Sequence, residues 1–274
     1  MKSNYLINSK ETVWTNEQEY RMHILSDRAD APVILCLHGG PGLPNFAYIK
    51  RYQAPLAENA TLVMWDQRGA GEAFSASFAF KKNLMKERIL ADIHNLAEYL
   101  KQRFHTDKII LFGHSFGAVL SVWYAQAHPE NVAFILNAGQ PVTLHAERTL
   151  SKDQKTEYAI RSLQTALPVL PSFVRDYKVS GLLKYALGVK WSGNTPLAKG
   201  EPDLMNTVKT LSVPVYIVMG TADVITPYDE AKAWFDALEA PLKHLYVFQD
   251  VGHQPMWEQA EKFNEIAASL LSDM

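Results

Sequence analysis

The sequence contains a single cysteine, Cys36, so no disulfide can form within the chain. One thiol fits a reducing compartment, and the first residues lack the apolar core of a secretory signal, so we expect a cytoplasmic protein. Long hydrophobic runs are also missing. The run at residues 31–37 is far shorter than the roughly 20 apolar residues that a membrane-spanning helix needs, so we expect no membrane partner.

An excess of charge of one sign is likewise absent, because 27 Lys and Arg residues stand against 29 Asp and Glu residues. No run of basic residues occurs, so nothing indicates a nucleic-acid partner. Internal repeats and low-complexity linkers are missing too. A chain of 274 residues without them suits one large α/β domain, or one domain that carries an insertion.

Short apolar runs rich in branched residues recur along the chain, and the first three end in HGGPG, DQRGAG and GHSFG. Continuous runs of this length predict strands buried on both faces, as in a parallel sheet. Weaker alternation over residues 5–28 predicts one or two edge strands. The predicted buried strands are 33–37, 61–65, 109–112, 132–136, 215–219 and 243–248.

Helical patterns lie between these strands. Ile89, Ile93, Leu96 and Leu100 recur at spacings of three and four, which predicts an amphipathic helix over residues 86–104. Strands that alternate with helices predict an α/β fold with a mostly parallel central sheet flanked by helices. Further helices are predicted at 118–127, 228–238 and 257–271.

Residues 140–207 break this alternation, with short helical patterns and several prolines. A long segment without sheet elements inside a compact domain is usually functional. We predict a helical cap over residues 140–207, inserted into a core domain formed by residues 1–139 and 208–274.

The motif Gly113-His114-Ser115-Phe116-Gly117 matches G-x-S-x-G between a predicted strand and a predicted helix. A serine on so tight a turn adopts a strained backbone, and glycine at both ends removes the clashes that side chains would cause. The turn lifts the serine hydroxyl clear of the sheet. Ser115 is therefore the predicted nucleophile.

A serine hydroxyl needs a base, and that base is expected late in the chain. His253 follows the last predicted strand, where a loop can reach back over the sheet. His244 lies within that strand, His128 precedes a proline at a helix end, and His114 adjoins the nucleophile on the tight turn. His145 lies in the predicted cap, before the acid in chain order. We predict His253 as the base.

The acid that orients this histidine should leave the strand before it. Asp223 lies in the loop after residues 215–219, at the same edge of the sheet as Ser115. Its rivals are Asp229, in the first turn of the next helix, and Asp250, close to the base in sequence. We favour Asp223, which would fix the imidazole tautomer and stabilise the imidazolium.

The order of these residues in the chain, serine then aspartate then histidine, is the order of the α/β-hydrolase fold. Its oxyanion hole requires two backbone N–H donors. We assign these to Phe116, directly after the nucleophile, and to Gly40 in the loop at residues 38–42. That loop lacks the GK[ST] ending of a phosphate loop. We assign no metal ligands.

HGGPG at 38–42, WDQRGAG at 65–71 and GHSFG at 113–117 together resemble the proline iminopeptidase family of α/β hydrolases. The resemblance extends over about residues 30–140, and over 214–256 by the triad pattern. It implies release of an N-terminal residue, often proline, from short peptides or amides, with no cofactor. The chain departs from the family at Phe116, where a tryptophan is common.

Family aminopeptidases use acidic cap residues to hold the substrate's free amine. Residues 140–207 contain six acidic and nine basic side chains, so the predicted cap is mildly positive. Glu147 is the best candidate for the amine anchor, although a solvated helix residue explains it equally well. Gly39 and Trp191 are further candidate substrate-binding residues.

Three functions remain open at this stage. The first is a proline iminopeptidase-like aminopeptidase that acts on small peptides through an acyl-enzyme. The second is a carboxylesterase or other small-molecule ester or amide hydrolase, favoured by the many apolar residues of the predicted cap. The third is a binding protein on a hydrolase scaffold, against which the presence of all three triad residues argues. In each case we expect a small-molecule or short-peptide partner, and we assign no oligomeric state.

Overall fold

The computed structural model describes residues 5–75, 85–143, 150–192 and 202–274. Within these ranges the chain forms a sheet of eight strands in the order β1-β2-β4-β3-β5-β6-β7-β8. The pairs β1–β2 and β2–β4 are antiparallel, and the remaining neighbours are parallel. The strands are β1 (Ile7–Thr15), β2 (Gln18–Ser26), β3 (Val33–Leu37), β4 (Thr61–Trp65), β5 (Ile109–His114), β6 (Val132–Ala138), β7 (Val215–Gly220) and β8 (Lys243–Phe248).

The structure confirms a mostly parallel sheet flanked by helices. The six predicted buried strands begin where expected, and some extend one or two residues further. The N-terminal segment forms two antiparallel strands, β1 and β2. Their two-residue turn, Asn16 and Glu17, has positive φ angles of 49° and 62°. A turn of this kind matches the twist of a hairpin, which explains how a weakly alternating segment pairs with itself.

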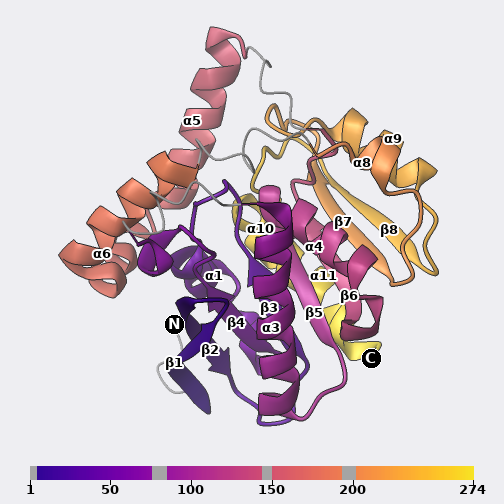
Figure 1. Ribbon diagram of the computed structural model, residues 1–274. Helices are drawn as coiled ribbons and strands as arrows, with labels where there is room; N and C mark the ends of the chain where they lie inside the picture. The colour runs from indigo at the N-terminus through magenta and orange to yellow at the C-terminus, as the bar shows by residue number, and fades with distance from the viewer. Residues whose placement is uncertain (1–4, 76–84, 144–149, 193–201) are drawn as a thin grey trace.

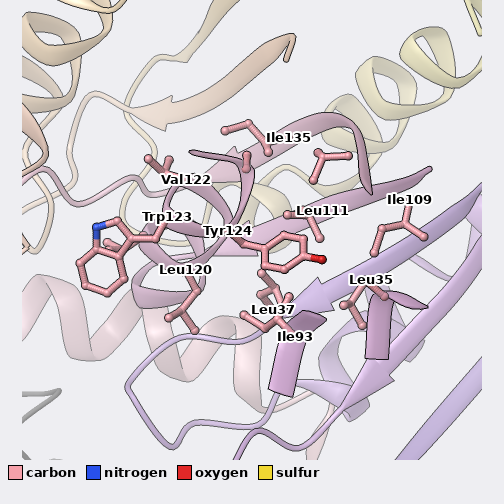
Figure 2. Packing of buried hydrophobic residues seen from close by; sticks show 14 of the residues in the cluster. Leu35, Leu37, Ile93, Ile109, Leu111, Leu120, Val122, Trp123, Tyr124 and Ile135 are labelled. Carbon is pink, nitrogen blue, oxygen red and sulfur yellow. The ribbon is translucent and has the colours of Figure 1, made fainter. Parts of the chain in front are cut away.

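Helices cover both faces of the sheet (Figure 1). Along β3, Val33, Leu35 and Leu37 belong to one buried cluster, whereas Ile34 and Cys36 belong to another on the opposite face. This alternation is the period-two geometry of a strand. Figure 2 shows the first cluster, where strand residues meet side chains from α3 (Lys86–Phe104) and α4 (Phe116–Ala127). The second cluster packs against α1 (Phe46–Tyr52), α10 (Pro255–Glu258) and α11 (Ala260–Ser272).

The predicted helix at 257–271 is in fact two helices, because Gln259 leaves the helical conformation between α10 and α11 with φ −129° and ψ 60°. Helix α4 begins two residues earlier than expected, directly after Ser115. The remaining short elements are α9 (Tyr228–Ala237) and the 3-10 helices η1 (Ala54–Glu58), η2 (Gly71–Ala73) and η3 (Pro129–Asn131). None of the described helices has both the length and the apolar character needed to cross a bilayer.

Between β6 and β7, where we predict the cap, the described chain forms α5 (Lys152–Ala166), α6 (Leu170–Ser192) and α8 (Leu204–Thr207). Helix α5 begins with a capping box. Gln154 N–H donates to Ser151 Oγ at 3.2 Å, and Ser151 N–H donates to Gln154 Oε1 at 2.9 Å. Helices α5 and α6 extend away from the sheet in Figure 1. The division of the chain into a core and a cap remains our interpretation.

A buried ion pair joins the loop after β4 to helix α3. The Arg68 guanidinium donates to both carboxylate oxygens of Asp92, at 2.7 and 2.6 Å, and the two side chains are 1% and 0% exposed. Tyr20 of β2 donates to the same carboxylate at 2.5 Å. The pair therefore ties the hairpin, the loop and α3 together in the interior.

We expect Asp92→Ala to lower the free energy of unfolding by about 3–5 kcal/mol, because it removes the carboxylate that balances the buried charge of Arg68. Equilibrium denaturation in urea measures this loss. Asp236→Ala is the matched control, since it removes an exposed ion pair with Lys232, and such pairs contribute little. A loss for Asp92→Ala no greater than that of the control would contradict the assignment.

Candidate active site

Ser115 occupies a strained turn between β5 and α4, with φ 53° and ψ −122°. Residues other than glycine rarely adopt positive φ, and such strain persists only where the surroundings impose it. Here neighbouring backbone atoms leave no space for a side chain at either end of the turn. A Cβ added at Gly113 would lie 2.6 Å from Ala118 Cα, and one at Gly117 would lie 2.0 Å from the carbonyl oxygen of Leu37. The turn therefore needs glycine at both ends, and Ser115 stays partly exposed at the carboxyl edge of the sheet.

The glycine-rich loop after β3 lies directly against this serine. A Cβ at Gly39 would be 2.9 Å from Ser115 Cβ, so only glycine allows the approach. The next residue, Gly40, has φ 113°. Phe116 is the first residue of α4, and its N–H is one of the helix-terminal donors without an intrahelical acceptor. The two predicted oxyanion donors thus come from segments that flank the serine.

His38 fixes the position of this loop relative to β4. Gln67 N–H donates to His38 Nε2 at 3.0 Å, and the Gln67 side-chain amide donates to the His38 carbonyl at 2.8 Å. Burial lowers the pKa of His38 to about 4, so its imidazole is neutral near pH 7 and can accept the first of these bonds. The motifs HGGPG and DQRG are therefore joined through one buried histidine.

The His253 ring is hydrogen-bonded to the carboxylate of Asp223, with 2.8 Å between Nδ1 and Oδ2. Both side chains are buried. Asp223 lies after β7 and His253 after β8, so two parallel strands deliver them to the same edge of the sheet. The bond leaves Nε2 as the ring nitrogen available to a substrate or a nucleophile. The rival carboxylate Asp229 lies in the first turn of α9, as predicted.

Thr226 completes the surroundings of this pair, and the sequence reasoning missed it. Its hydroxyl donates to Asp223 Oδ2 at 2.6 Å and lies 3.1 Å from His253 Nδ1. The N–H groups of Ile225 and Thr226 donate to Asp223 Oδ1 at 2.8 and 2.9 Å. An aspartate side chain that accepts from the backbone N–H two residues later forms an Asx turn. A threonine three residues after Asp223 was therefore the available signal in the sequence, because that turn brings its hydroxyl to the carboxylate.

These contacts determine the charge of Asp223. Burial by itself raises the pKa of this carboxyl, but the positive charge of protonated His253 and hydrogen bonds from His253 and Thr226 outweigh that effect. The pKa therefore lies below its ordinary value. Asp223 is consequently ionised at neutral pH, as a group that stabilises an imidazolium must be.

His114 supports the histidine loop from the nucleophile turn. Its Nε2–H donates to the carbonyl oxygen of His253 at 3.2 Å, and burial lowers the pKa of His114 to about 3, so the ring is neutral. A link thus runs from the residue before Ser115 to His253. Within the described residues, the Ser115 hydroxyl makes no hydrogen bond to His253. Catalytic contacts of this kind often tighten only when substrate binds.

Helix α6 covers the DQRG loop. The ring of Trp191 lies on Gly69, where an added Cβ would be 2.1 Å from a ring carbon. The Tyr177 hydroxyl donates to Asp66 Oδ1 at 3.3 Å, and burial raises the pKa of Asp66 to about 7. Trp191 thus contacts the loop next to the site. Glu147, the predicted amine anchor, lies outside the described residues. Across the described ranges, no group of three or more His, Cys, Asp or Glu side chains is placed to hold a metal ion.

Residues 33–260 match the family described as serine aminopeptidase, S33. The match spans the Ser115 turn, Asp223 and His253. The chain belongs to this family. It is therefore a hydrolase, and membership implies a small-molecule or peptide substrate.

Relatives named as peptidases resemble this chain along most of its length. It is 23% identical to the probable aminopeptidase YbaC of Bacillus subtilis, over 85% of this chain and 86% of the relative. It is 26% identical to the proline iminopeptidase of Lactobacillus delbrueckii subsp. bulgaricus, over 97% and 98% of the two chains. The resemblance to proline iminopeptidases inferred from the motifs is confirmed.

Solved structures extend the comparison of the fold. A putative lipase from Acinetobacter baumannii superposes with a TM-score of 0.70 at 16% identity, covering 97% of this chain and 91% of the other. The proline iminopeptidase of Mycobacterium smegmatis superposes with a TM-score of 0.66 at 18% identity, covering 97% and 98%. At such low identities the likeness concerns the fold, and it confirms the α/β-hydrolase fold.

The pKa of Asp223 predicts a pH-dependent contribution to stability. Because this pKa is lower in the folded chain than the value of about 3.9 in an unfolded chain, ionised Asp223 stabilises the fold above that pH. The contribution is lost as the pH falls through the folded-state pKa. The difference in unfolding free energy between wild type and Asp223→Asn should therefore be larger at about pH 6 than at about pH 3.

Urea denaturation, monitored by tryptophan fluorescence, measures this difference in unfolding free energy at both pH values. Ser269→Ala, a change of an exposed residue of α11 that carries no titrating group, is the control and should give a difference independent of pH. An Asp223→Asn difference that is the same at both pH values would contradict the depressed pKa.

Proposed function

We propose that this chain is a serine aminopeptidase that cleaves an amide bond through an acyl-enzyme. In this proposal Ser115 is the nucleophile, His253 the general base and Asp223 the carboxylate that orients it. The hydrogen-bonded Asp223–His253 pair, at the same sheet edge as the strained Ser115, carries the proposal. A buried ionised aspartate bonded to Nδ1 fixes the tautomer in which Nδ1 carries the proton and Nε2 offers its lone pair, and it stabilises the imidazolium that forms.

The first half of the reaction forms the acyl-enzyme. His253 Nε2 removes the Ser115 hydroxyl proton while Oγ attacks the substrate carbonyl carbon, and the carbonyl oxygen becomes an oxyanion. The N–H groups of Phe116 and Gly40 donate to that oxyanion, and each such donor contributes about 3–4 kcal/mol of transition-state stabilisation. The imidazolium then gives its proton to the leaving amine as the carbon–nitrogen bond breaks.

The second half repeats these roles with water. His253 removes a proton from a water molecule, whose oxygen attacks the acyl carbon. The ester bond to Ser115 Oγ breaks, and the serine recovers its proton from the imidazolium. The released acid is the N-terminal residue of the substrate.

The names of the relatives support a free N-terminal residue, proline among the candidates, as the acyl group. Such a substrate presents an ammonium group, for which a carboxylate is the natural partner. We keep Glu147 as the proposed anchor, with Gly39 and Trp191 beside the acyl group and no cofactor required. Residues 140–207 form the proposed cap, which contributes Glu147 and Trp191. A cytoplasmic location remains our expectation.

A carboxylesterase is the second candidate, because aromatic rings gather on α6. The ring of Phe173 lies 4.8 Å from that of Tyr177 and 4.9 Å from that of Tyr185, between centroids. Aromatic rings on the proposed cap suit an acyl group without a charge. The basic excess over residues 140–207 points in the same direction.

We expect Ser115→Ala to remove essentially all hydrolysis and all labelling by a serine-directed phosphonate, while circular dichroism and the melting temperature stay close to wild type. The reason is that no other hydroxyl lies on the strained turn between β5 and α4. Ser272→Ala, which changes a serine at the end of α11, should keep full activity. Residual turnover within roughly tenfold of wild type would exclude Ser115 as the nucleophile.

Paired substrates separate the two candidate functions. An aminopeptidase should cleave the 4-nitroanilides of proline and alanine with a free amine and leave their N-acetylated forms intact. Glu147→Gln should then raise KM for the free-amine substrates roughly tenfold or more, since the ammonium loses a charged partner. Asp153→Asn, in the first turn of α5, is the control. Cleavage of a short-chain 4-nitrophenyl ester alone would favour the esterase, and an unchanged KM would exclude Glu147 as the anchor.

A further inference from the structure

One face of helix α5 contacts the loop that carries His253. Tyr158, Arg161 and Thr165 follow one another at spacings of three and four, which places them on the same side of the helix. Each contacts that loop or lies beside it. The Tyr158 ring centroid is 6.4 Å from that of His253, and the Thr165 hydroxyl donates to the side-chain oxygen of Gln254 at 2.6 Å. Helix α5 therefore meets the loop at His253 and at the residue after it.

Arg161 makes the charged contact of this face. One guanidinium nitrogen, Nη1, donates to the carbonyl oxygen of Asp250 at 2.8 Å and to Glu258 Oε2 at 3.0 Å. The other nitrogens, Nε and Nη2, donate to Glu157 on the same helix at 3.0 and 2.8 Å. A Cβ at Gly252 would lie 2.9 Å from Arg161 Cδ, so the loop passes closely beneath this side chain.

Glu258 of α10 also binds this loop. Its Oε2 accepts from the N–H of Gly252 at 3.0 Å, and its Oε1 accepts from the N–H of Gln254 at 3.2 Å. One carboxylate therefore binds the backbone immediately before and immediately after His253. Hydrogen bonds to an ionised acceptor are shorter and stronger than neutral ones. These two bonds therefore restrain the backbone on both sides of His253.

We propose that Glu258 is a positioning residue for His253, and that Arg161 couples this support to helix α5. The inference rests on the proposed role of His253 as the general base. Glu258 touches neither substrate nor reacting atoms; it acts through the two N–H groups that flank the histidine. Because proton transfer depends strongly on placement at the scale of about 1 Å, a loosened loop slows the reaction without weakening substrate binding.

The ion pair between Arg161 and Glu258 also connects the His253 loop to helix α5. Glu258 Oε2 accepts from both Gly252 N–H and Arg161. A movement of α5 therefore displaces the Glu258 carboxylate and, with it, the backbone that flanks His253. Helix α5 belongs to the segment that we propose as the cap. When substrate contacts move that segment, the Arg161–Glu258 ion pair therefore changes the position of the base.

The test measures the rate of Ser115 labelling by a phosphonate, together with kcat and KM for the anilide or ester that the wild-type chain cleaves. Glu258→Gln should lower both kcat and the labelling rate at least tenfold, with KM within twofold of wild type. The new amide would present a donor to groups that are themselves donors. The NMR resonance of the His253 Nδ1 proton should broaden or shift in this variant.

Arg161→Met provides an independent test. The Arg161 side chain lies on a partly exposed helix face, and its loss leaves both hydrogen bonds from the backbone to Glu258 in place. We expect a threefold or greater fall in kcat and labelling. In the double variant the two effects should be less than multiplicative, since both act on one network. Glu157→Gln is the matched control: it removes the negative charge that faces Nε and Nη2, leaves both Nη1 contacts in place, and should keep activity within twofold of wild type.

Two results would overturn the proposal in distinguishable ways. A folded Glu258→Gln variant that is labelled as fast as wild type excludes Glu258 as a positioning residue, while the proposed function stands. An Arg161→Met variant equal to Glu157→Gln excludes the coupling to α5. Failure of the phosphonate to label Ser115 in the wild-type chain overturns the proposed function itself, and this inference with it.

Discussion

The site depends on how closely helix α4 packs against the ends of β3 and β5. Gly117 lies so near the carbonyl oxygen of Leu37, and Gly113 so near the start of α4, that neither position can hold a Cβ. The chain can turn in this space only if Ser115 takes a positive φ, at a cost of about 1–3 kcal/mol that the surrounding packing sustains. As a result the hydroxyl lies beside the glycine loop at residues 38–42 and at the N-terminus of α4, which begins with Phe116.

The parallel sheet then gathers the other groups at the same edge. The glycine loop follows β3, the DQRG loop follows β4, and Asp223 and His253 follow β7 and β8, so segments about 200 positions apart in the chain lie at one edge of the sheet. Carboxyl ends of parallel strands are the usual place for such sites. Buried polar links connect these loops: His38 with Gln67, and His114 with the carbonyl of His253. The edge is therefore a connected structure and not a set of independent loops.

A shared fold does not decide the substrate. Chains similar to this one at 16–18% identity include a lipase, an epoxide hydrolase and a proline iminopeptidase, so the same sheet supports several reactions. In this chain the segment between β6 and β7, which we propose as the cap, contains helices α5 and α6. In this chain α6 lies on the DQRG loop through Trp191, and α5 contacts the His253 loop through Arg161. The elements proposed to select the substrate also support the loops beneath it.

The sequence by itself determined the mostly parallel sheet, the starts of its six buried strands and the family, because apolar runs that end in HGGPG, DQRG and GHSFG are local signals. It also indicated Ser115, Asp223 and His253, since loops after successive parallel strands must meet at one edge. Only the tertiary structure decided which polar groups surround them. Thr226 and Glu258 contact Asp223 and the His253 loop across three to six positions in sequence, whereas Arg161 reaches this loop only because α5 packs against it. The long-range contact of a single side chain, such as that of Arg161 with the Asp250 carbonyl, leaves no periodic trace in a sequence, so only the packing reveals it.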